Sequence, residues 1–533
     1  MSSNQTSNKS AAVSQITTHP ALAIIGVLLG ALTSVFTGRL LSIGLADVQG
    51  AIGASSDYMT YITTAFNAAN MFIGPLTVFM GAILGARRVL LWASAIFILA
   101  EFLSPFATHN PLVFLVLQTI AGLAAGTYYP LTFTIIIRNF SLKYLYLGLA
   151  IYALDILAST NIAHLVESFY ITHLSWQWIF WNALLPAPIM MFCVYFGIPR
   201  QPIAKPKAGM EFWGFLYAAF AFTFIYIGLD QGERLDWLNS PWIAAYFGVG
   251  IFLLFATLFS HARKPNPMIN LSFLRSRNFL ILGFVLVCFR FLLLEPTLLI
   301  PSYLALLHNY RPEQTAAVLA WIAVPELLLA PIAGLLLYKV DSRFVCAFGF
   351  ALVGLSSYAS SRLDPAWTGE TFLFDQLITA AGLALALTGL IATLLRSALK
   401  VGALSNPVNI LTISCWFQTC RLFGAEIGKA ILSRFLKVQS DFHYSVVSAH
   451  INGDWLTNDR LKALTFNNFG AGSGIDDAKV KALIELGGSL KQQVGLLAFS
   501  DGFVLVALSA ACCILAIGFV SYSPPLVAAK SSK

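Results

Sequence analysis

Long apolar segments alternate with short polar connections along almost the whole chain. Fourteen segments of 17–28 residues are apolar enough to cross a bilayer, whose hydrocarbon core takes about 20 helical residues. Because an open sheet edge cannot persist in lipid, each segment is predicted to be a helix. The pattern therefore predicts an all-α integral membrane protein with spans at 21–45, 58–82, 88–107, 112–136, 144–171, 178–198, 213–229, 241–260, 279–301, 314–337, 343–360, 370–396, 406–432 and 498–522.

The composition agrees with this pattern. Hydrophobic residues make up 58% of the 533 residues and charged residues 11%, with a mean hydropathy of +0.77. Soluble domains average about 25% charged residues, so most of this chain is expected to contact lipid. The first segment, 1–19, is polar and lacks the basic start and cleavage site of a signal peptide, which predicts a disordered cytoplasmic tail.

Basic residues are unevenly divided between the two sides of the predicted bundle. With the N-terminus inside, the short outer connections hold only Arg234, Arg311 and Arg362, and most other Lys and Arg residues fall inside. By the positive-inside rule, both termini are expected in the cytoplasm. This distribution also explains the formal charge of +8 without a nucleic-acid partner.

Two connections differ from the others. The segment 261–278 is basic and contains prolines, and is expected to lie along the inner surface. The segment 433–497 is long and polar, with a possible amphipathic helix at 476–490, and is predicted to be an extracytoplasmic loop.

Cofactor and enzyme chemistry find no support in the motifs. The seven cysteines lie in apolar stretches without a CxxC pair or a Cys/His cluster, which argues against structural metal sites and disulfides. The sequence also lacks a P-loop, a nucleophile elbow and a zinc motif. We therefore expect no metal, no cofactor and no enzyme activity.

Several local patterns occur in a fixed order on these spans. They are GPLTVFMGAILGARR (74–88, with Pro75, Gly85, Arg87 and Arg88), GLAAGTYYPL (122–131, with Gly122, Gly126 and Pro130), WQWIFWN (176–182), FLRSRNF (273–279), VDSR (340–343) and RLFGAEIG (421–428, with Arg421, Gly424 and Gly428). Together they resemble the fourteen-helix drug/proton antiporters of the major facilitator superfamily.

The resemblance implies an architecture and a class of function. It implies a major facilitator fold with six-helix bundles at 20–200 and 279–533, and two inserted helices with a cytoplasmic linker at 201–278. It implies a secondary transporter that exchanges protons for a small-molecule substrate. The long outer segment is similar to that of inner-membrane pumps that work with a periplasmic adaptor and an outer-membrane channel.

The family's usual coupling residues are displaced in this chain. The acidic residue of the first helix aligns with Thr37, and Arg39 follows two positions later. The acid after the second helix is Ala82, and the buried arginine of the fourth helix is Gln118. The glycine–proline motif of the fifth helix aligns with AHLVES (163–168). The resemblance thus implies a divergent branch with a relocated charge network.

Charged residues inside the spans are the candidates for that network. An arginine at mid-membrane costs at least about 2.5–3.5 kcal/mol, so Arg39 is expected to face a cavity and have a partner. Asp155 is a candidate proton carrier that could pair with Arg39, although a permanent structural ion pair is an open alternative. Glu326 follows Pro325 in a helix expected to break and line a cavity. The predicted proton-coupling and charge network is Arg39, Asp155, Arg290, Glu295, Glu326 and Asp375.

The spacing and position of four charged residues bear on these assignments. Arg290 and Glu295 are spaced too poorly to pair on one helix face, so each is expected to meet another helix. Asp375 could instead simply reach water near a helix end. Arg421 belongs to the RLFGAEIG pattern at 421–428, and its role could be purely structural.

Polar and aromatic residues of the first half are candidates to line the substrate cavity: Asn67, Asn70, Gln118, Tyr128 and Tyr129. His164 and Glu167 share a helix face and favour a proton relay over a metal site, which lacks a third ligand. The leading functional prediction is proton-driven export of lipophilic or amphipathic compounds. Export of organic anions such as aromatic acids is the alternative, and a membrane scaffold or enzyme is a remote one.

Overall fold

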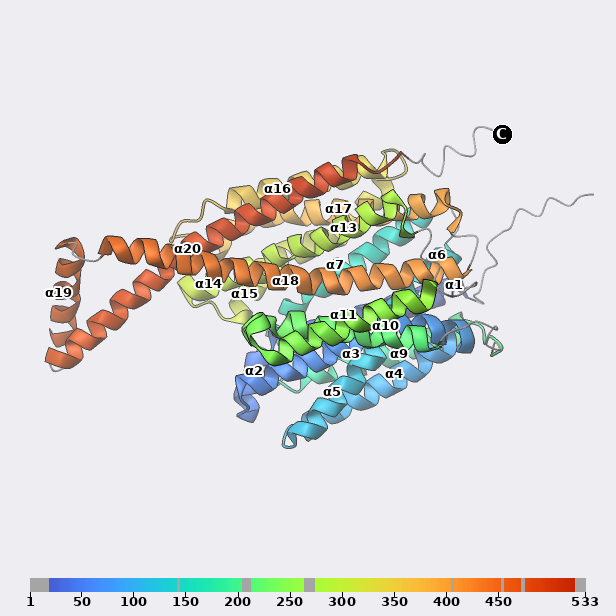
Figure 1. Cartoon of the computed structure of the whole chain (residues 1–533), viewed down its shortest axis with the longest axis horizontal. Helices are drawn as coiled ribbons and strands as arrows, with labels where there is room; N and C mark the ends of the chain where they lie inside the picture. Colours follow the sequence, from blue (N-terminus) through green and yellow to red (C-terminus); the bar gives the residue numbers. More distant parts are fainter. Residues whose placement is uncertain are drawn as a thin grey trace, which may run out of the picture.

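Helices lying side by side build the whole of the described structure, a computed structural model (Figure 1). It describes residues 19–140, 144–203, 212–262, 274–403, 407–451, 455–470 and 475–522. The longer helices are α1 (Pro20–Ile43), α3 (Ser56–Leu84), α4 (Ala86–Leu103), α5 (Pro111–Ala125), α6 (Tyr128–Asn139), α7 (Leu145–His173), α9 (Pro186–Gly197), α10 (Phe212–Gly232), α11 (Pro241–Ala262), α13 (Arg277–Leu292), α15 (Pro312–Leu336), α16 (Ser342–Ser360), α17 (Leu373–Lys400), α18 (Pro407–Ile451), α19 (Trp455–Gly470) and α20 (Ile475–Gly518).

Shorter helical pieces connect these elements. They are α2 (Leu45–Ile52), η1 (Ser104–Ala107), α8 (Trp178–Trp181), η2 (Asn182–Leu184), η3 (Trp237–Asn239), the π-helical turn η4 (Glu295–Leu299), α14 (Ile300–His308) and η5 (Gly369–Phe372).

The described residues include 12 helical stretches long and apolar enough to cross a membrane. These stretches match twelve of the predicted spans. The helices α3 and α18 cover the other two predicted spans, 58–82 and 406–432. Both pack against helices that belong to the twelve stretches: α3 against α5 and α10, and α18 against α13 and α20. The protein is therefore an all-α, multi-pass membrane protein as predicted, and the count of fourteen spans stays a prediction.

Two hydrophobic cores hold the helices together. One core lies entirely within residues 23–198 and joins α1, α3, α4, α5, α6, α7 and α9. The second joins residues 279–520 and extends onto one face of α6 and α7. The two halves of the bundle therefore meet along α6 and α7, whose residues contribute to both cores.

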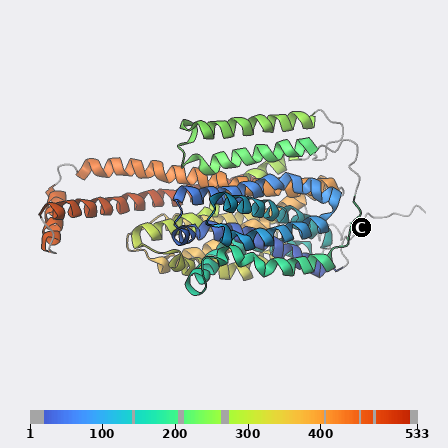
Figure 2. The ribbon, with the colours of Figure 1, turned by 90° about the horizontal axis from the view of Figure 1, so that it is seen from below.

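The helical pair α10 and α11 lies along one side of the bundle (Figure 2). Helix α10 packs against α3 and α18, with the rings of Phe79 and Phe215 5.7 Å apart and those of Phe222 and Phe423 5.5 Å apart. Helix α11 exposes most of its side chains, and 11% of its apolar window is buried. An apolar helix with so little protein contact is solvated by lipid.

The segment 433–497, expected as a loop, is mostly helical. Helix α18 is 45 residues long and α20 is 44, so each extends about 66–68 Å at 1.5 Å per residue. A bilayer core is about 30 Å thick, and both helices continue beyond the bundle to meet α19 (Figure 1). Hydropathy detects the part of a helix that lies in lipid and cannot distinguish its polar continuation from a loop.

We call the end of the bundle from which this helical projection extends the projecting end. The opposite end, where α1 begins and α20 stops, is the terminal end (Figure 1).

One helix of the second half is interrupted. Helix α13 ends at Leu292, the π-helical turn η4 covers Glu295–Leu299, and α14 resumes at Ile300. Pro296 lacks a backbone N–H and therefore cannot donate to the carbonyl one turn earlier. The interruption lies beside the main cavity of the protein.

Candidate functional site

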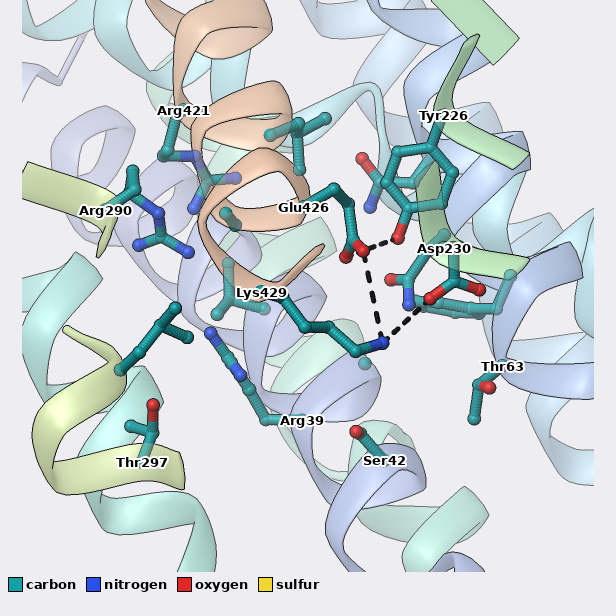
Figure 3. Close-up of a pocket in the computed structure, with 18 of the residues that line it drawn as sticks. Arg39, Ser42, Thr63, Tyr226, Asp230, Arg290, Thr297, Arg421, Glu426 and Lys429 are labelled. Atoms are coloured by element: carbon teal, nitrogen blue, oxygen red, sulfur yellow. Dashed lines mark hydrogen bonds and ion pairs between the residues drawn. The ribbon is translucent and has the colours of Figure 1, made fainter. Parts of the chain in front are cut away.

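A charged cavity of about 230 Å³ lies between α1, α3, α10, α13, η4 and α18 (Figure 3). Its lining comes from both halves of the bundle and from the inserted helix α10. The cavity-lining residues with polar or charged side chains are Ser34, Arg39, Ser42, Thr63, Asn67, Asn70, Tyr226, Asp230, Arg290, Thr297, Arg421, Glu426 and Lys429.

Three arginines from three helices face this cavity. Arg39 projects from α1, Arg290 from α13 and Arg421 from α18, and Figure 3 shows their side chains around the same space. Among the described residues, none of the three forms an ion pair, and Nε of the buried Arg290 has no hydrogen-bond partner. Buried guanidinium groups without acidic partners are costly, which favours an anion or a negatively polarised group in this cavity.

The other wall of the cavity carries a paired set of charges. Nζ of Lys429 lies 2.8 Å from Oδ1 of Asp230 and 4.0 Å from Oε2 of Glu426. The hydroxyl of Tyr226 donates to Oε1 of Glu426 at 2.8 Å. The side chain of Lys429 is 51% exposed, so the cavity reaches solvent here, toward the projecting end.

Asp230 lines the cavity although the sequence pattern does not single it out. It lies two residues before the end of α10, just beyond the predicted span 213–229, where it looks like a residue of an outer connection. Its carboxylate accepts a hydrogen bond from Thr64 of α3 as well as pairing with Lys429 of α18. Asp230 thus bridges the two halves through the inserted helix.

Asp155 lies deeper in the bundle and does not meet Arg39. Helices α1 and α7 both start at the terminal end; Arg39 lies about 28 Å along α1 and Asp155 about 15 Å along α7. The predicted pair is therefore wrong, because the two side chains differ in depth. Oδ2 of Asp155 instead accepts a hydrogen bond from the Tyr129 hydroxyl at 3.1 Å. The guanidinium carbon of Arg421 lies 3.8 Å from the Tyr129 ring centroid, so Tyr129 links Asp155 to the arginine cluster.

The remaining acids of the predicted network lie outside the cavity. Oε2 of the fully buried Glu326 accepts a hydrogen bond from Asn161 of α7 at 2.8 Å, between the two halves. Glu295, also fully buried, contacts Ser357 of α16. Asp375 is partly exposed and accepts from Ser360 at 2.8 Å. Arg290 and Glu295 thus meet different helices, as their spacing predicts.

The predicted cavity residues divide into two groups. Asn67 and Asn70 line the cavity. Gln118 does not, because it is buried among α4, η1 and α5, where its amide donates to the Ser104 hydroxyl at 2.8 Å. Tyr128 is also inside the first core, packed edge-on against Phe97. Helix periodicity identifies the polar face of a helix but cannot show which neighbour covers it.

Glycines of the motifs allow close approach of helices. A Cβ on Gly122 would lie 2.1 Å from the backbone oxygen of Phe66, and one on Gly126 would lie 2.5 Å from that of Asn70. A Cβ on Gly424 or Gly428 would lie 3.0 or 3.2 Å from a backbone Cα of α13. These contacts hold α5 against α3 and α18 against α13, which places two cavity walls.

Of the other motif residues, Gly85, Arg87 and Arg88 lie at the turn between α3 and α4 near the terminal end, whereas the two prolines lie within spans. Gly85 separates α3 from α4 with a φ of +83°, a conformation that favours glycine. Arg88 donates to the backbone oxygen of Leu84 at 3.1 Å, and Arg87 lies over the Tyr195 ring at 4.3 Å. Pro75 is inside α3 and Pro130 is in the first turn of α6.

Contacts between the halves close the cavity at the terminal end. Nε of Arg396 in α17 donates to the Tyr146 hydroxyl of α7 at 2.7 Å, and the same arginine forms an ion pair with Asp341 at 3.1 Å. The hydroxyls of Thr134 in α6 and Ser414 in α18 are 2.9 Å apart. The cavity is therefore accessible from one end of the bundle, the projecting end.

No group of three or more His, Cys, Asp or Glu side chains that could hold a metal ion occurs in the part of the chain that the structure describes.

Comparisons with known proteins agree with this architecture. The chain is 25% identical over 334 residues to the Probable multidrug resistance protein EmrY of Escherichia coli, covering 62% of this chain and 63% of that one. It is 22% identical over 444 residues to the Multidrug export protein EmrB of Haemophilus influenzae, covering 81% and 83%. Among solved structures, the proton:xylose symporter XylE superposes with a TM-score of 0.55 at 11% identity over 96% of this chain and 99% of that one. The sequence profile of the Major Facilitator Superfamily matches residues 27–428, so the protein belongs to this superfamily of membrane proteins.

Proposed function

We propose that this protein is a secondary transporter that exports lipophilic or amphipathic compounds in exchange for protons. The observation that carries the proposal is a charged cavity lined by both halves of the bundle and closed at one end by contacts between them. Two halves that rock about such a cavity would expose it alternately to each side of the membrane. The relatives named for multidrug export and resistance support this assignment.

The proposed architecture follows the same reasoning. Residues 20–200 and 279–533 form the two six-helix bundles, and residues 201–278 provide the inserted pair and the linker. The terminal end faces the cytoplasm and the projection α18–α20 lies outside the inner membrane. There it is suitably placed to meet a periplasmic adaptor linked to an outer-membrane channel.

Protons are coupled to transport through Asp155 in this proposal. Its carboxylate is buried, and its hydrogen bond from Tyr129 connects it to Arg421 at the cavity wall. A proton on Asp155 would remove the negative charge that faces Arg421, leaving the arginine free to hold a substrate. Glu326, at the contact between α7 and α15, is the second acid that we assign to this network.

The test is proton-coupled efflux in everted vesicles with Asp155→Asn. We expect this variant to lose substrate-dependent proton movement while still binding substrate. Glu101→Gln is the matched control, because Glu101 is an equally buried acid in the first half, next to Gln118 and away from the cavity. Unchanged coupling in Asp155→Asn would remove this residue from the mechanism.

Organic anions are the second candidate substrate class, and the arginine cluster favours them. The cavity wall carries Arg39, Arg290, Arg421 and Lys429 against Asp230 and Glu426, a formal excess of positive charge. Transport of an aromatic acid compared with that of a cationic dye of similar size distinguishes the two classes. Proton release on addition of the acid, without a response to the dye, would favour the anion exporter.

A further inference from the structure

A second cluster of buried polar groups lies on the far side of the interrupted helix from the cavity. Its centre is Glu295, which is fully buried in the first turn of η4. The Ser357 hydroxyl of α16 donates to Oε2 of Glu295, and Thr379 of α17 adjoins the same carboxylate. Oε1 of Glu295 has no hydrogen-bond partner among the described residues.

Oxygen atoms surround this carboxylate. Thr379 donates to Ser356 at 2.8 Å, and Ser356 donates to the backbone oxygen of Asp375 at 2.8 Å. Gln376 lies three residues before Thr379 and therefore on the same face of α17. It is fully buried, and neither atom of its amide has a partner in the described part of the chain.

The charges around Glu295 leave it without a counter-ion. The charge that acts on Glu295 comes from another acid, Asp375, and no described basic group forms an ion pair with either of them. An isolated buried carboxylate is strongly disfavoured unless a cation or a proton neutralises it. The unpartnered Oε1 of Glu295 and the unpartnered amide of Gln376 are also exceptions to the rule that buried polar groups are hydrogen-bonded, and a bound ion would account for both.

The backbone at this point is suited to holding a cation. Membrane transporters bind Na⁺ where a helix is interrupted and its carbonyl oxygens become free, and hard cations take carboxylate, amide and carbonyl oxygens as ligands. Helix α13 passes into the π-helical turn η4, where the Ile300 N–H bonds the Glu295 carbonyl, and Pro296 has no N–H to donate to a carbonyl of the preceding turn. Glu295 therefore places its carboxylate where a backbone carbonyl oxygen can also act as a ligand for a cation.

We propose that Glu295, Ser357, Thr379 and Gln376 form a binding site for a sodium ion. An unpartnered carboxylate oxygen, an unpartnered buried amide, the lack of a counter-ion and a proline-containing π-helical turn coincide at this position. The amide oxygen of Gln376 and the hydroxyls complete a set of neutral oxygens around one negative charge, which suits a monovalent ion. The site is separate from the arginine cavity and does not require the proposed export function.

The ion enters from the projecting end. Asp375 begins α17 there and is partly exposed, and Ser360 and Ser356 lie between it and the buried Glu295. Along this row of oxygens an ion can exchange its bound water molecules for protein oxygens one step at a time. The same interrupted segment contributes Leu294, Thr297 and Leu298 to the arginine cavity, so occupation of the site would stiffen one cavity wall.

The test is binding of radioactive ²²Na⁺ to the purified full-length protein, measured by scintillation proximity. We expect saturable binding of one ion per chain that unlabelled NaCl displaces and KCl or choline chloride does not. Glu295→Gln should lower the affinity at least tenfold, and Ser357→Ala should lower it severalfold. NaCl should also raise the melting temperature of the wild-type protein, compared with choline chloride at equal ionic strength.

Glu101→Gln is the matched control, because Glu101 is an equally buried acid in the first half, outside both this cluster and the proposed proton network. It should keep both the binding and the sodium-dependent rise in melting temperature. The proposal is overturned if sodium binding is not saturable, or if Glu295→Gln folds with an unchanged melting temperature and still binds sodium. A melting temperature of the wild type that responds to pH but not to sodium would also overturn it, since Glu295 would then hold only a proton. None of these results would affect proton-coupled export through Asp155.

Discussion

The three cavity arginines differ in their local partners, although all are of one residue type. Arg421 lies against the Tyr129 ring and its Nε donates to the Gln418 amide oxygen at 3.0 Å. Nε of Arg290 has no partner among the described residues. Arg421 is therefore held in place before a substrate arrives, whereas Arg290 keeps an unused donor. Of the three arginines, the one with a free donor should contribute most to the affinity for an anionic ligand, because its N–H can bond the ligand directly.

We predict that Arg290→Gln weakens binding of an aromatic acid by about 10- to 100-fold, because hydrogen bonds to charged groups contribute about 1.5–3 kcal/mol. Binding of a neutral compound should change little. Equilibrium binding to the purified protein measures both. Arg362→Gln is the control, since Arg362 lies over Tyr358 away from the cavity. An equal loss for acid and neutral compound would mean that the variant has damaged the fold of the cavity.

At the scale of the elements, hydropathy predicted where helices cross the membrane but not which surfaces they share. Arg39 and Arg290 could be recognised because a charge is conspicuous within an apolar segment. Asp230 could not, since it follows its apolar segment and looks like a loop residue. The predicted pair of Arg39 and Asp155 was wrong although both helix starts were predicted to within one residue. Neighbouring helices do not bring two residues together when the residues lie at different depths, here about 28 Å along α1 and about 15 Å along α7. The polar half of α18 looks like a loop in the sequence, because its residues are not apolar enough to indicate lipid contact.

The turn between α10 and α11 is tied to α18 by Glu233. Its carboxylate accepts from the Trp237 indole at 2.8 Å and lies 3.3 Å from Nζ of Lys437 and 3.8 Å from Arg434. Partial burial raises the pKa of Glu233, but the hydrogen bonds from Trp237 and Lys437 and the two positive charges outweigh it and hold the pKa below its usual value of 4.5. A lowered folded-state pKa stabilises the turn above pH 4.5, and this stabilisation is lost as the pH falls through the folded-state pKa.

We predict that Glu233→Gln opens this turn by a small amount at neutral pH, because partly exposed ion pairs contribute about 0.2–1 kcal/mol. Hydrogen exchange of residues 233–240, corrected for the intrinsic rate, should rise by up to about fivefold. The wild-type turn should show the same rise in acid, and the variant should not. Asp236→Asn in the same turn is the control. A turn that exchanges equally in both proteins at neutral pH would show that Glu233 does not hold it.

At the scale of the whole molecule, the cavity is closed at one end of the bundle and reaches solvent at the other. Contacts between the halves are close at the terminal end, where Phe133 of α6 and Phe417 of α18 stack with ring centroids 5.4 Å apart and Tyr146 meets Arg396. At the projecting end the cavity reaches solvent beside Lys429. The structure is thus the conformation open toward the projecting end, and transport requires the contacts at the terminal end to separate.

A disulfide across the terminal end should hold this conformation. The hydroxyls of Thr134 and Ser414 are 2.9 Å apart on helices of different halves, close enough for the paired change Thr134→Cys and Ser414→Cys to bridge. In a background without the native cysteines, we predict that oxidation stops transport and reduction restores it, while substrate still binds from the projecting side. The paired change Thr393→Cys and Ser342→Cys is the control, because these hydroxyls are also 2.9 Å apart but both lie within the second half. If both cross-links stop transport, motion inside one half is required; if neither does, the halves do not need to part between α6 and α18, and the rocking mechanism is wrong for this protein.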